Sequence, residues 1–285
     1  MRSNYDMEEI KPAWCPGCGD FSILKTVKQT LDELNLPQEQ VCFVSGIGQA
    51  AKLPQYLKVS YFNGLHGRTL PVATGIKLSN PELTVIVHSG DGCSYGEGGN
   101  HFIHTIRKNP NIKVFAHNNQ IYGLTKGQTS PTTLRGQKTT SYPRGSVSEP
   151  FNPLAVAIAL DASFVARAFS GDSEQTKEIM KKAIQHKGFA LVDIFQPCVS
   201  FNKFNTFKWY KEHTYYLDEA HDVKNREKAF NLAIKTDKYP LGIFYINDNK
   251  SVLEDNVGVY DVNKQPLYSR YPNYDKIEEF LSKYK

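Results

Sequence analysis

The fold is decided by LTVIVHSGDG (83–92) together with IKVFAHNN (112–119). Each stretch begins with a run of apolar and β-branched residues, which is typical of a strand buried in a parallel sheet. The residues between them, from Tyr95 to Lys108, are enough to form the crossover helix that joins two parallel strands. The G-D-G and N-N motifs therefore follow the carboxyl ends of two strands, which is the edge of an open α/β sheet where ligands bind.

Asp91 and Asn119 are expected to face one crevice at that edge. Oxygen atoms from a carboxylate, a side-chain amide and a backbone carbonyl suit an octahedral Mg²⁺ that holds phosphate groups. Gly90 and Gly92 would let the backbone approach those phosphates closely. Asp-Gly is also an ordinary turn signal, so G-D-G alone leaves a simple turn open.

The chain alternates helical and strand patterns from Asp20 to Phe195, which predicts a doubly wound α/β fold with a mainly parallel sheet. Further elements are predicted as strands over 41–45, 163–169 and 189–195, and as helices over 21–34, with Asp20 as its cap, and 174–186. We expect one domain over residues 1–200, with a long functional loop over 125–150. A C-terminal extension over 201–285, irregular in pattern, is expected to pack on a partner subunit.

Composition and charge limit the classes of protein to which the chain can belong. Its 285 residues are 40% hydrophobic, which is enough for one large core. The 34 basic and 29 acidic residues give a net charge of +5, which is too diffuse to indicate nucleic-acid binding. No apolar run approaches the roughly 18 residues of a membrane span, and residues 1–12 lack the apolar core of a secretory signal. We therefore expect a cytoplasmic protein that binds neither nucleic acid nor membrane.

Further motifs connect the chain to a known family. In chain order they are AWCPGCGDF (13–21), SGIGQAAKLP (45–54), GLHGRTLPVATGIKLSNP (64–81), QIYGLTKGQTSPTT (120–133) and QPCVSFN (196–202). Together with G-D-G and N-N, they resemble the β subunit of a 2-oxoacid:ferredoxin oxidoreductase over roughly residues 12–207. The pair G-D-G and N-N then resembles the clamp with which thiamine-diphosphate enzymes hold Mg²⁺ and the diphosphate.

The resemblance implies an enzyme with the thiamine-diphosphate-binding fold of the diphosphate type. Such an enzyme converts a 2-oxoacid, pyruvate or 2-oxoglutarate, and coenzyme A into an acyl-CoA and CO2, and passes the electrons through an iron–sulfur cluster to ferredoxin. The implied cofactors are thiamine diphosphate, Mg²⁺ and a 4Fe–4S cluster. The glutamate that activates thiamine diphosphate belongs to the α subunit in this family, so we expect an obligate heteromer with two copies of each chain.

The resemblance also assigns residues to the site. Those expected to bind the cofactor are Ile47, Gly48, Gln49, His66, Gly67, Gly90, Asp91, Gly92, Cys93, Asn119, Ile121, Gly123, Leu124 and Thr125. Mg²⁺ is expected to bind Asp91, Asn119 and the backbone oxygen of Ile121. His66 and Lys126 are expected to be catalytic, the lysine because it offers a positive charge to an anionic substrate. A satisfied buried histidine and a solvated loop lysine are the simpler interpretations of these two residues.

The five cysteines, an odd number, fit a reducing compartment better than a disulfide framework. Cys15 and Cys18 form a C-x-x-C pair whose spacing suits zinc and an iron–sulfur cluster equally well. The resemblance makes Cys198 a third cluster ligand, but the family's usual fourth cysteine, after G-I-G, is replaced here by Gln49. The fourth ligand stays open among Gln49, Cys93, another side chain, water and a partner residue. A three-iron cluster and a zinc site stay open as well.

Three other functions are left open by the sequence. A non-redox thiamine-diphosphate subunit, such as half of a decarboxylase or transketolase, would use the clamp without a cluster. A nonenzymatic iron–sulfur scaffold would bind only a cluster. A zinc-stabilised module needs a fourth Cys or His near the C-x-x-C pair, yet the nearest downstream thiol, Cys42, is expected to be a small buried hydrophobe. The 2-oxoacid, the electron acceptor and the direction of reaction are not fixed by the sequence.

Overall fold

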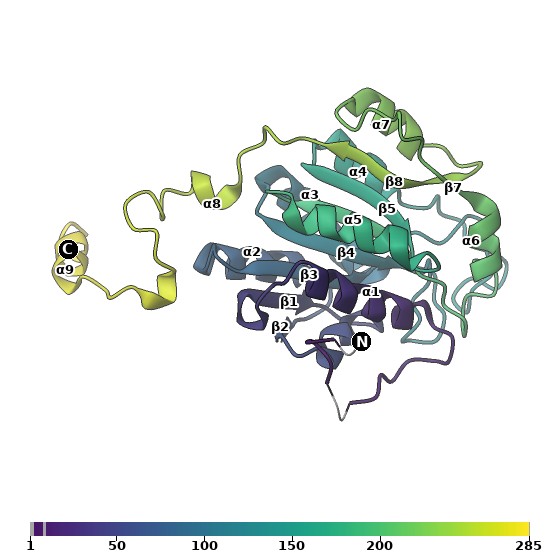
Figure 1. Cartoon of the computed structure of the whole chain (residues 1–285), viewed down its shortest axis with the longest axis horizontal. Coiled ribbons are helices and arrows are strands. Elements are labelled where there is room, and N and C mark those ends of the chain that lie inside the picture. The colour runs from purple at the N-terminus through teal and green to yellow at the C-terminus, as the bar shows by residue number, and fades with distance from the viewer. Residues whose placement is uncertain (1–2, 8–9, 285) are drawn as a thin grey trace.

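A computed structural model describes residues 3–7 and 10–284, and one eight-stranded sheet organises them (Figure 1). The strand order is β2-β1-β3-β4-β6-β5-β8-β7. The strands are β1 (Val41–Ser45), β2 (Ser60–Asn63), β3 (Thr84–Gly90), β4 (Ile112–Asn118), β5 (Phe164–Phe169), β6 (Ala190–Phe195), β7 (Thr214–Tyr216) and β8 (Tyr239–Ile246). β8 runs antiparallel to β5, whereas the other neighbouring strands pair in parallel. The predicted doubly wound, mainly parallel α/β fold is confirmed.

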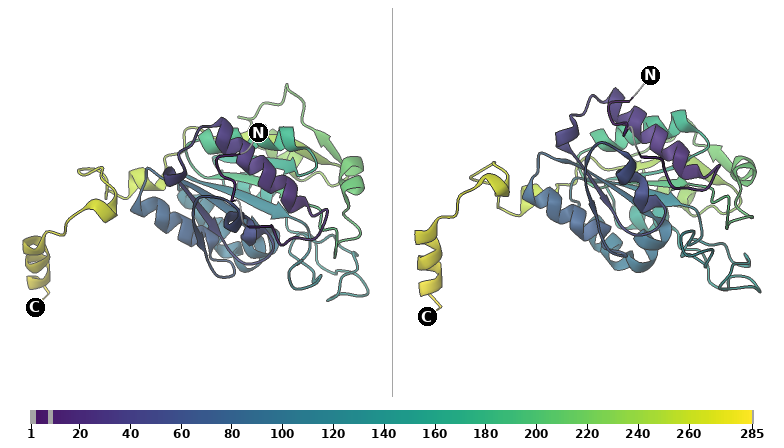
Figure 2. Two further views of the ribbon diagram at one scale, coloured as in Figure 1. Left: turned by 60° about the horizontal axis from the view of Figure 1, so that its bottom comes forward. Right: turned by 90° about the horizontal axis from the view of Figure 1, so that it is seen from below.

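Helices cover both faces of the sheet (Figures 1 and 2). α1 (Gly19–Glu33) and α5 (Ser173–Gln185) pack on one face, where their apolar residues join one core cluster. The helices that build the second core cluster on the other face are α2 (Thr69–Ser79), α3 (Gly99–Lys108), α4 (Pro153–Ala159) and α7 (Arg226–Ala233). Other helical elements are η1 (Gln38–Gln40), η2 (Ala50–Tyr56), η3 (Gly92–Glu97), α6 (Phe207–His213), α8 (Leu253–Asn256), η4 (Leu267–Ser269) and α9 (Tyr274–Ser282).

Most elements up to residue 195 lie where the sequence predicts them. The predicted strands over 41–45 and 112–118 match β1 and β4 residue for residue. β5 and β6 each begin one residue later than predicted, and α3 forms the crossover between β3 and β4. Residues 125–150 form the predicted long loop between β4 and α4. The local hydrophobic pattern is sufficient to predict these strands because they are buried on both faces of the sheet.

The prediction that Asp20 caps α1 is wrong. The helix begins at Gly19 with Cys18 as its N-cap, so Asp20 lies inside the first turn. Its carboxylate is buried and accepts a hydrogen bond from Nδ1 of His117 at 2.7 Å. Asp20 therefore ties α1 to β4, because a buried carboxylate requires a hydrogen-bond partner.

The sheet continues past residue 200. β8 pairs with β5, and α7 packs on α4, so residues 207–246 are part of the body of the protein. The expectation of irregular structure in this region is wrong for β8, whose run PLGIFYI (240–246) is apolar and β-forming. Pro240 is tolerated because β8 lies close to the end of the sheet, with only the three-residue β7 beyond it.

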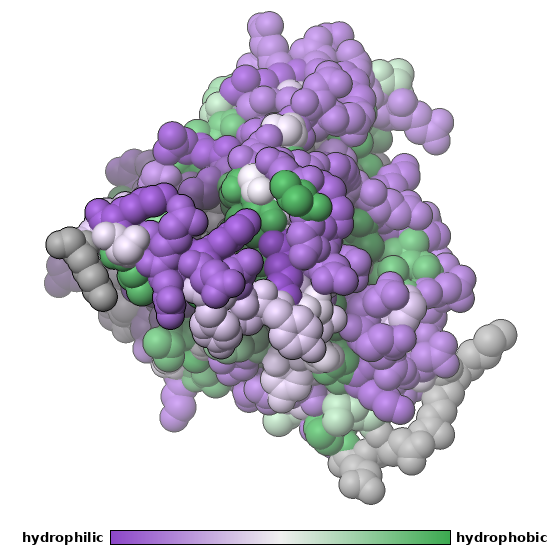
Figure 3. Space-filling view, turned by 90° about the vertical axis from the view of Figure 1, so that its left-hand side faces the viewer, coloured by the Kyte–Doolittle hydropathy of each residue, from purple (hydrophilic) through white to green (hydrophobic). Residues whose placement is uncertain are grey.

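Residues 261–284 form a C-terminal arm that leaves the body in every ribbon view (Figures 1 and 2). Its root is fixed by Tyr260, whose hydroxyl donates to the backbone oxygen of Leu78 at 2.6 Å. Large apolar side chains of the arm that are exposed are Val262, Leu267, Tyr268, Tyr271, Tyr274, Ile277, Phe280, Leu281 and Tyr284. Figure 3 views the molecule from the side of the arm and shows apolar groups scattered among hydrophilic ones.

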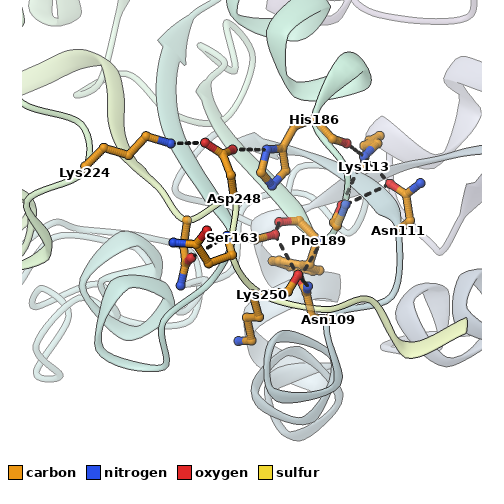
Figure 4. Close-up of polar contacts among 12 residues, drawn as sticks. Asn109, Asn111, Lys113, Ser163, His186, Phe189, Lys224, Asp248 and Lys250 are labelled. Carbon is orange, nitrogen blue, oxygen red and sulfur yellow. Dashed lines mark hydrogen bonds and ion pairs between the residues drawn. The ribbon is translucent and has the colours of Figure 1, made fainter. Parts of the chain in front are cut away.

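The amino-terminal edge of the sheet, opposite the predicted ligand edge, is closed by polar side chains (Figure 4). The Lys113 ammonium donates to Asn111 Oδ1 at 2.6 Å and to the backbone oxygen of Gly188 at 3.0 Å. The Asn109 amide donates to the backbone oxygen of Ser251 at 3.0 Å, which ties the segment after β8 to the start of β4. Burial, and then the nearby Lys77, lowers the pKa of Lys113 to about 7.

Candidate functional site

A cavity of about 80 Å³ lies at the carboxyl ends of β3 and β4. Gly90 and His117 are paired across these strands, so the two motifs that follow them are brought side by side. The lining residues are Ile47, Gly48, Gln49, Ala50, His66, Gly90, Asp91, Gly92, Cys93, Asn119, Ile121, Tyr122, Gly123, Leu124 and Thr125. The structure therefore gathers every residue predicted to bind the cofactor except Gly67, together with His66 but without Lys126.

Gly67 and Lys126 lie just outside the cavity. Gly67 is buried behind it, with a positive φ of 67°, and its N–H donates to Cys93 Sγ at 3.2 Å. Lys126 is exposed and also has a positive φ, 78°, in a turn closed by the hydrogen bond from Gly127 N to Tyr122 O. Its contact with a substrate stays a prediction.

The Asp91 carboxylate is held in place by two hydroxyl groups. Ser130 Oγ and Thr132 Oγ1 each donate to Asp91 Oδ2 at 2.6 Å, and the side chain is almost fully buried. Burial raises the pKa of Asp91 to about 6, although the two hydroxyls oppose that rise. A divalent cation beside the carboxylate would restore its charge, because the charge of a bound ion dominates the local pKa. Asp91 also opens a π-helical turn, η3, a distortion that is frequent at functional sites.

The two asparagines of N-N have different roles. Asn118 is buried and donates to both oxygens of Asp193 at 3.2 Å, and its Oδ1 lies 2.8 Å from Thr132 Oγ1. Asn119 lines the cavity, and its Oδ1 accepts only the N–H of Ile121, at 3.0 Å, among the hydrogen bonds of the described residues. An amide oxygen has a second lone pair, so Asn119 is the one of the two that is available to a ligand.

This donor set fits Mg²⁺ and a diphosphate. It combines a buried, oriented carboxylate with an amide oxygen, and both are hard ligands. Gly92 leaves no room for a side chain, since an added Cβ would lie 2.3 Å from the ring of Tyr122. A cavity of about 80 Å³ is too small to enclose all of thiamine diphosphate, whose remainder would extend beyond it.

A polar group that sequence analysis missed lies at the mouth of the cavity. Tyr122 donates its hydroxyl proton to Glu97 Oε1 at 3.0 Å, and Nδ1 of His66 lies 3.9 Å from the same oxygen. The His66 side chain is 57% exposed, so the interpretation as a buried, satisfied histidine does not hold. Burial, and then Glu97, raises the pKa of Tyr122 well above its ordinary value, which keeps this phenol protonated and able to donate.

A second cavity, of about 30 Å³, brings the three predicted cluster ligands together. Cys15, Cys18 and Cys198 all line it. The other residues of its lining are Trp14, Asp20, Gln49, Asn119, Gly123, Gln196, Val199, Ser200 and Phe201. Burial, and then Asp20, raises the pKa of the Cys18 thiol, so binding a metal there would require the loss of a proton.

The chemistry of these residues fits an iron–sulfur cluster. Within residues 3–7 and 10–284, no three His, Cys, Asp or Glu side chains are arranged to hold a single metal ion. Each thiolate of a cluster binds its own iron, so the three thiols need not converge on one point. Cys42 is buried in β1, and Cys93 lines the other cavity, so neither accompanies the three thiols.

Comparisons with known proteins agree with this geometry. The family model "Thiamine pyrophosphate enzyme, C-terminal TPP binding domain" matches residues 43–194, and the model for the C-terminal part of the "Pyruvate ferredoxin oxidoreductase beta subunit" matches residues 198–262. The chain is 42% identical over 273 residues to "2-oxoacid:ferredoxin oxidoreductase 1, subunit beta" of Aeropyrum pernix, covering 92% of this chain and 85% of the relative. The chain belongs to the β subunits of the 2-oxoacid:ferredoxin oxidoreductases.

Other members of this family resemble the chain to a similar extent. The β subunit is 47% identical over 246 residues to "2-oxoglutarate oxidoreductase subunit KorB" of Mycobacterium tuberculosis, covering 86% of this chain and 62% of the relative. A solved "2-oxoglutarate:ferredoxin oxidoreductase from Magnetococcus marinus with 2-oxoglutarate, coenzyme A and succinyl-CoA bound" superposes with a TM-score of 0.89 and 35% identity, over 98% of this chain and 94% of that one. Among the described residues of this β subunit, no helix has the length and apolarity to cross a membrane.

The site of this β subunit is supported by residues from beyond position 200. Asn202 Nδ2 donates to the backbone oxygen of Asn119 at 3.0 Å, and Tyr210 donates its hydroxyl proton to Gln120 Oε1 at 2.9 Å. Gln120 has a positive φ of 58°, so these contacts hold a strained backbone position next to a predicted ligand. Sequence analysis quoted Asn202 within a motif but assigned no contact to it or to Tyr210, because no local pattern marks a partner that is more than 80 positions away.

Proposed function

We propose that this β subunit acts in the coenzyme A-dependent oxidative decarboxylation of a 2-oxoacid to an acyl-CoA and CO2. One observation carries the proposal: the Asp91 cavity and the cavity of the three thiols share Gln49, Asn119 and Gly123 in their linings. An added Cβ on Gly123 would lie 3.5 Å from Cys198 Sγ and 3.8 Å from Asn119 Nδ2. A cofactor site and a cluster site that adjoin each other provide a short path for electrons.

Asp91, Asn119 and the backbone oxygen of Ile121 would hold Mg²⁺, and Ser130 and Thr132 would keep the Asp91 carboxylate in position. The remaining residues proposed to contact thiamine diphosphate are Ile47, Gly48, Gln49, His66, Gly67, Gly90, Gly92, Cys93, Gly123, Leu124 and Thr125. When bound, thiamine diphosphate would supply the electron sink that decarboxylation needs. Cys15, Cys18 and Cys198 would hold the 4Fe–4S cluster.

The proposal includes a partner subunit. Asp91 is the one carboxylate among the described residues that line the cavity, and it would be occupied by the metal, so the glutamate that activates thiamine diphosphate must come from another chain. We propose that this chain is an α subunit, that the assembly holds two copies of each, and that the C-terminal arm packs on the partner. The exposed apolar side chains of the arm support this role, because large apolar groups that water covers poorly can be buried by a partner. The protein is expected to work in the cytoplasm.

The substrate proposed first is 2-oxoglutarate, with pyruvate as the alternative. The solved relative binds 2-oxoglutarate, coenzyme A and succinyl-CoA, and the relative from M. tuberculosis is named for 2-oxoglutarate. Lys126 and His66 would act on the anionic substrate from the rim of the cavity. Ferredoxin is the proposed electron acceptor, because it is in the names of the relatives.

The test uses the heteromer of this chain with its α subunit, purified without oxygen. We expect iron, acid-labile sulfide, an EPR signal after dithionite reduction, and reduction of methyl viologen that requires both a 2-oxoacid and coenzyme A. Asp91→Ala should abolish this activity, whereas Asp237→Ala, at an exposed position, should leave it unchanged. Release of CO2 without an electron acceptor, from a protein that contains no iron, would support the non-redox alternative instead.

A further inference from the structure

The Gln49 side chain lines the cavity of the three thiols, and its oxygen makes no hydrogen bond to the described residues. Its Oε1 is buried and, among the described residues, has no hydrogen-bond partner. A buried amide oxygen without a partner is costly, so such an atom in a native structure calls for an explanation. The backbone at this position is fixed, because Trp14 Nε1 donates to the backbone oxygen of Gln49 at 3.0 Å.

Three other polar side chains in this lining, those of Asp20, Gln196 and Asn119, already have hydrogen-bond partners. Asp20 accepts from His117 at 2.7 Å, and the Cys18 thiol lies 3.5 Å from its second oxygen. Gln196 turns its amide nitrogen toward Cys18 Sγ at 3.3 Å, and the Asn119 oxygen accepts from Ile121 N. Gln49 Oε1 is thus the oxygen that a fourth iron could use without breaking any of these hydrogen bonds.

We propose that Gln49 Oε1 is the fourth ligand of the cluster, next to the thiolates of Cys15, Cys18 and Cys198. This inference rests on the proposed function. An amide oxygen is a harder and weaker ligand for iron than a thiolate, so one of the four irons is held less firmly than the other three. One-electron oxidation of [4Fe–4S]²⁺ then releases Fe²⁺ and leaves [3Fe–4S]⁺, and the electron passes to an added oxidant such as ferricyanide.

A neutral ligand also changes the charge of the cluster. Replacing a thiolate by an amide makes the complex less negative by one unit, and net charge is one of the terms that set the reduction potential. The wild-type cluster is therefore reduced at a higher potential than the same cluster in a Gln49→Cys variant. The direction of this shift tests whether Gln49 touches the iron, because a merely structural glutamine would not produce it.

The experiment compares wild-type heteromer with Gln49→Cys and Gln49→Ala by iron analysis and EPR during ferricyanide titration. Wild type should lose one iron of four and develop the signal of an oxidised three-iron cluster, and added Fe²⁺ with a reductant should reverse the change. Gln49→Cys should keep all four irons at the same dose, and Gln49→Ala should be isolated with three. Gln175→Ala is the matched control, since its Oε1 is also buried and without a partner in the described chain but lies on α5.

The proposal is overturned if Gln49→Ala retains four irons with the oxidation resistance of wild type, or if wild type loses none. Failure of the proposed function gives a different result, in which neither wild type nor Gln49→Cys binds iron at all. Circular dichroism of each variant separates the loss of a ligand from a failure to fold.

A different observation carries a second inference. A hollow of about 630 Å³ next to the thiols is lined by a basic aromatic surface, which we define as Arg135, Lys138, Lys203, Phe201 and Phe204. These five residues are exposed, with 40% of Phe201 and 52% of Phe204 accessible to solvent. Phe201 also lines the cavity of the three thiols, so this surface adjoins the proposed cluster directly.

The positive charge of the protein is concentrated in the segments that carry this surface. Residues 120–150 and 197–213 contain seven Lys and Arg residues and two Glu residues, a net charge of +5 that equals the net charge of the whole chain. The rest of the chain is therefore neutral on balance. A charge placed in this way attracts an acidic partner to one place and raises its rate of association.

We infer that an acidic, ferredoxin-like electron carrier docks on the basic aromatic surface and takes electrons there. Exposed aromatic side chains within a basic rim suit a small, transient interface of the kind that electron carriers form. This inference also rests on the proposed function, since it assigns a place to the acceptor.

The test is the triple variant Arg135→Glu, Lys138→Glu, Lys203→Glu in the heteromer. The KM for ferredoxin should rise at least tenfold at low salt, the difference should shrink at high salt, and the rate with methyl viologen should stay unchanged. The matched control reverses three exposed lysines near α7, with Lys228→Glu, Lys235→Glu and Lys238→Glu, and should leave the KM for ferredoxin unchanged.

Three outcomes would overturn the docking site: an unaltered KM for ferredoxin, an increased KM for coenzyme A, which would make this a phosphate-binding surface, or the loss of the α subunit from the variant. An inactive wild-type heteromer with methyl viologen would instead refute the proposed function itself.

Discussion

Gly67 offers a sharp test of how the candidate site is built. It lies where the segment that carries His66 crosses the end of the π-helical turn η3, and its φ of 67° is in the left-handed region. An added Cβ would lie 2.5 Å from Glu97 C, 2.6 Å from Glu97 O and 2.7 Å from Gly98 N. All three are backbone atoms, so no side chain can move aside to relieve the contact.

Gly67→Ala should therefore destabilise the protein substantially. A left-handed conformation costs an ordinary residue about 1–2 kcal/mol. Overpacking of a tight contact adds about 1–3 kcal/mol. Together these give a loss of roughly 2–5 kcal/mol in the free energy of unfolding, and at ~2–4 °C per kcal/mol the Tm of the heteromer should fall by about 5–20 °C. His66 would also shift relative to Glu97, so the affinity for thiamine diphosphate should fall with the Tm.

Gly75→Ala is the control. Gly75 lies inside α2, and an added Cβ would have no heavy atom within 4 Å. Alanine is favoured over glycine within a helix by about 0.5–1 kcal/mol, so this variant should melt slightly above wild type. Both variants are compared by calorimetry of the heteromer at one scan rate. If Gly67→Ala melts within about 1 °C of wild type, a difference below ~0.5 kcal/mol, the close approach inferred at Gly67 is refuted.

Three further predictions follow from the contacts described above. Thr132→Val removes a hydrogen bond to Asp91. Since hydrogen bonds to charged groups contribute about 1.5–3 kcal/mol, the Mg²⁺-dependent affinity for thiamine diphosphate should fall roughly ten- to a hundredfold by calorimetric titration. Equal affinity would show that Thr132 does not position the Asp91 carboxylate for the metal. Burial lowers the pKa of Lys113 from 10.5 to about 7, so between pH 7 and pH 10.5 the unfolded chain binds more protons than the folded protein. The free energy of unfolding of wild type should therefore rise from pH 7 to pH 10 relative to Lys113→Met. Parallel pH profiles in urea denaturation would contradict this prediction. Truncation after Tyr260 removes the C-terminal arm and should weaken assembly with the α subunit on gel filtration while leaving the Tm of the isolated β subunit unchanged. An intact heteromer would show that the arm is not needed.

The sequence predicts the part of the fold that is encoded locally. β1 and β4 match their predicted ranges because an apolar run between turn residues is sufficient to define a strand buried on both faces. The apolar runs that precede G-D-G and N-N also predict that Asp91 and Asn119 lie together, because neighbouring parallel strands end at the same edge of the sheet. The structure therefore reproduces the elements that short stretches of the sequence predict.

The rest of the site depends on contacts between distant parts of the chain. Asn202 and Tyr210 support the Asn119 loop across 83 and 90 positions, and each belongs to a region whose sequence is not periodic. Ser130 and Thr132 are part of a quoted motif, but only the folded loop shows that both hydroxyls reach one oxygen of Asp91. Their residue types indicate hydrogen-bonding groups, whereas their partners are set by tertiary structure.

Exposed apolar side chains near the Asp91 cavity bear on the proposed partner subunit. β2 is the edge strand of the sheet, separated from β3 by β1, and its Tyr61 and Phe62 are about half exposed, at 48% and 49%. Leu65, next to His66, is 73% exposed, and Leu124, in the lining of the cavity, is 42% exposed. Single exposed apolar residues are ordinary, but Leu124 in the lining and Leu65 next to His66 together give the cavity an apolar rim that water covers poorly. Burial of this rim by the α subunit would close the cavity, exclude water from the Asp91 carboxylate and supply the missing glutamate in one step, so cofactor binding and subunit assembly should be coupled.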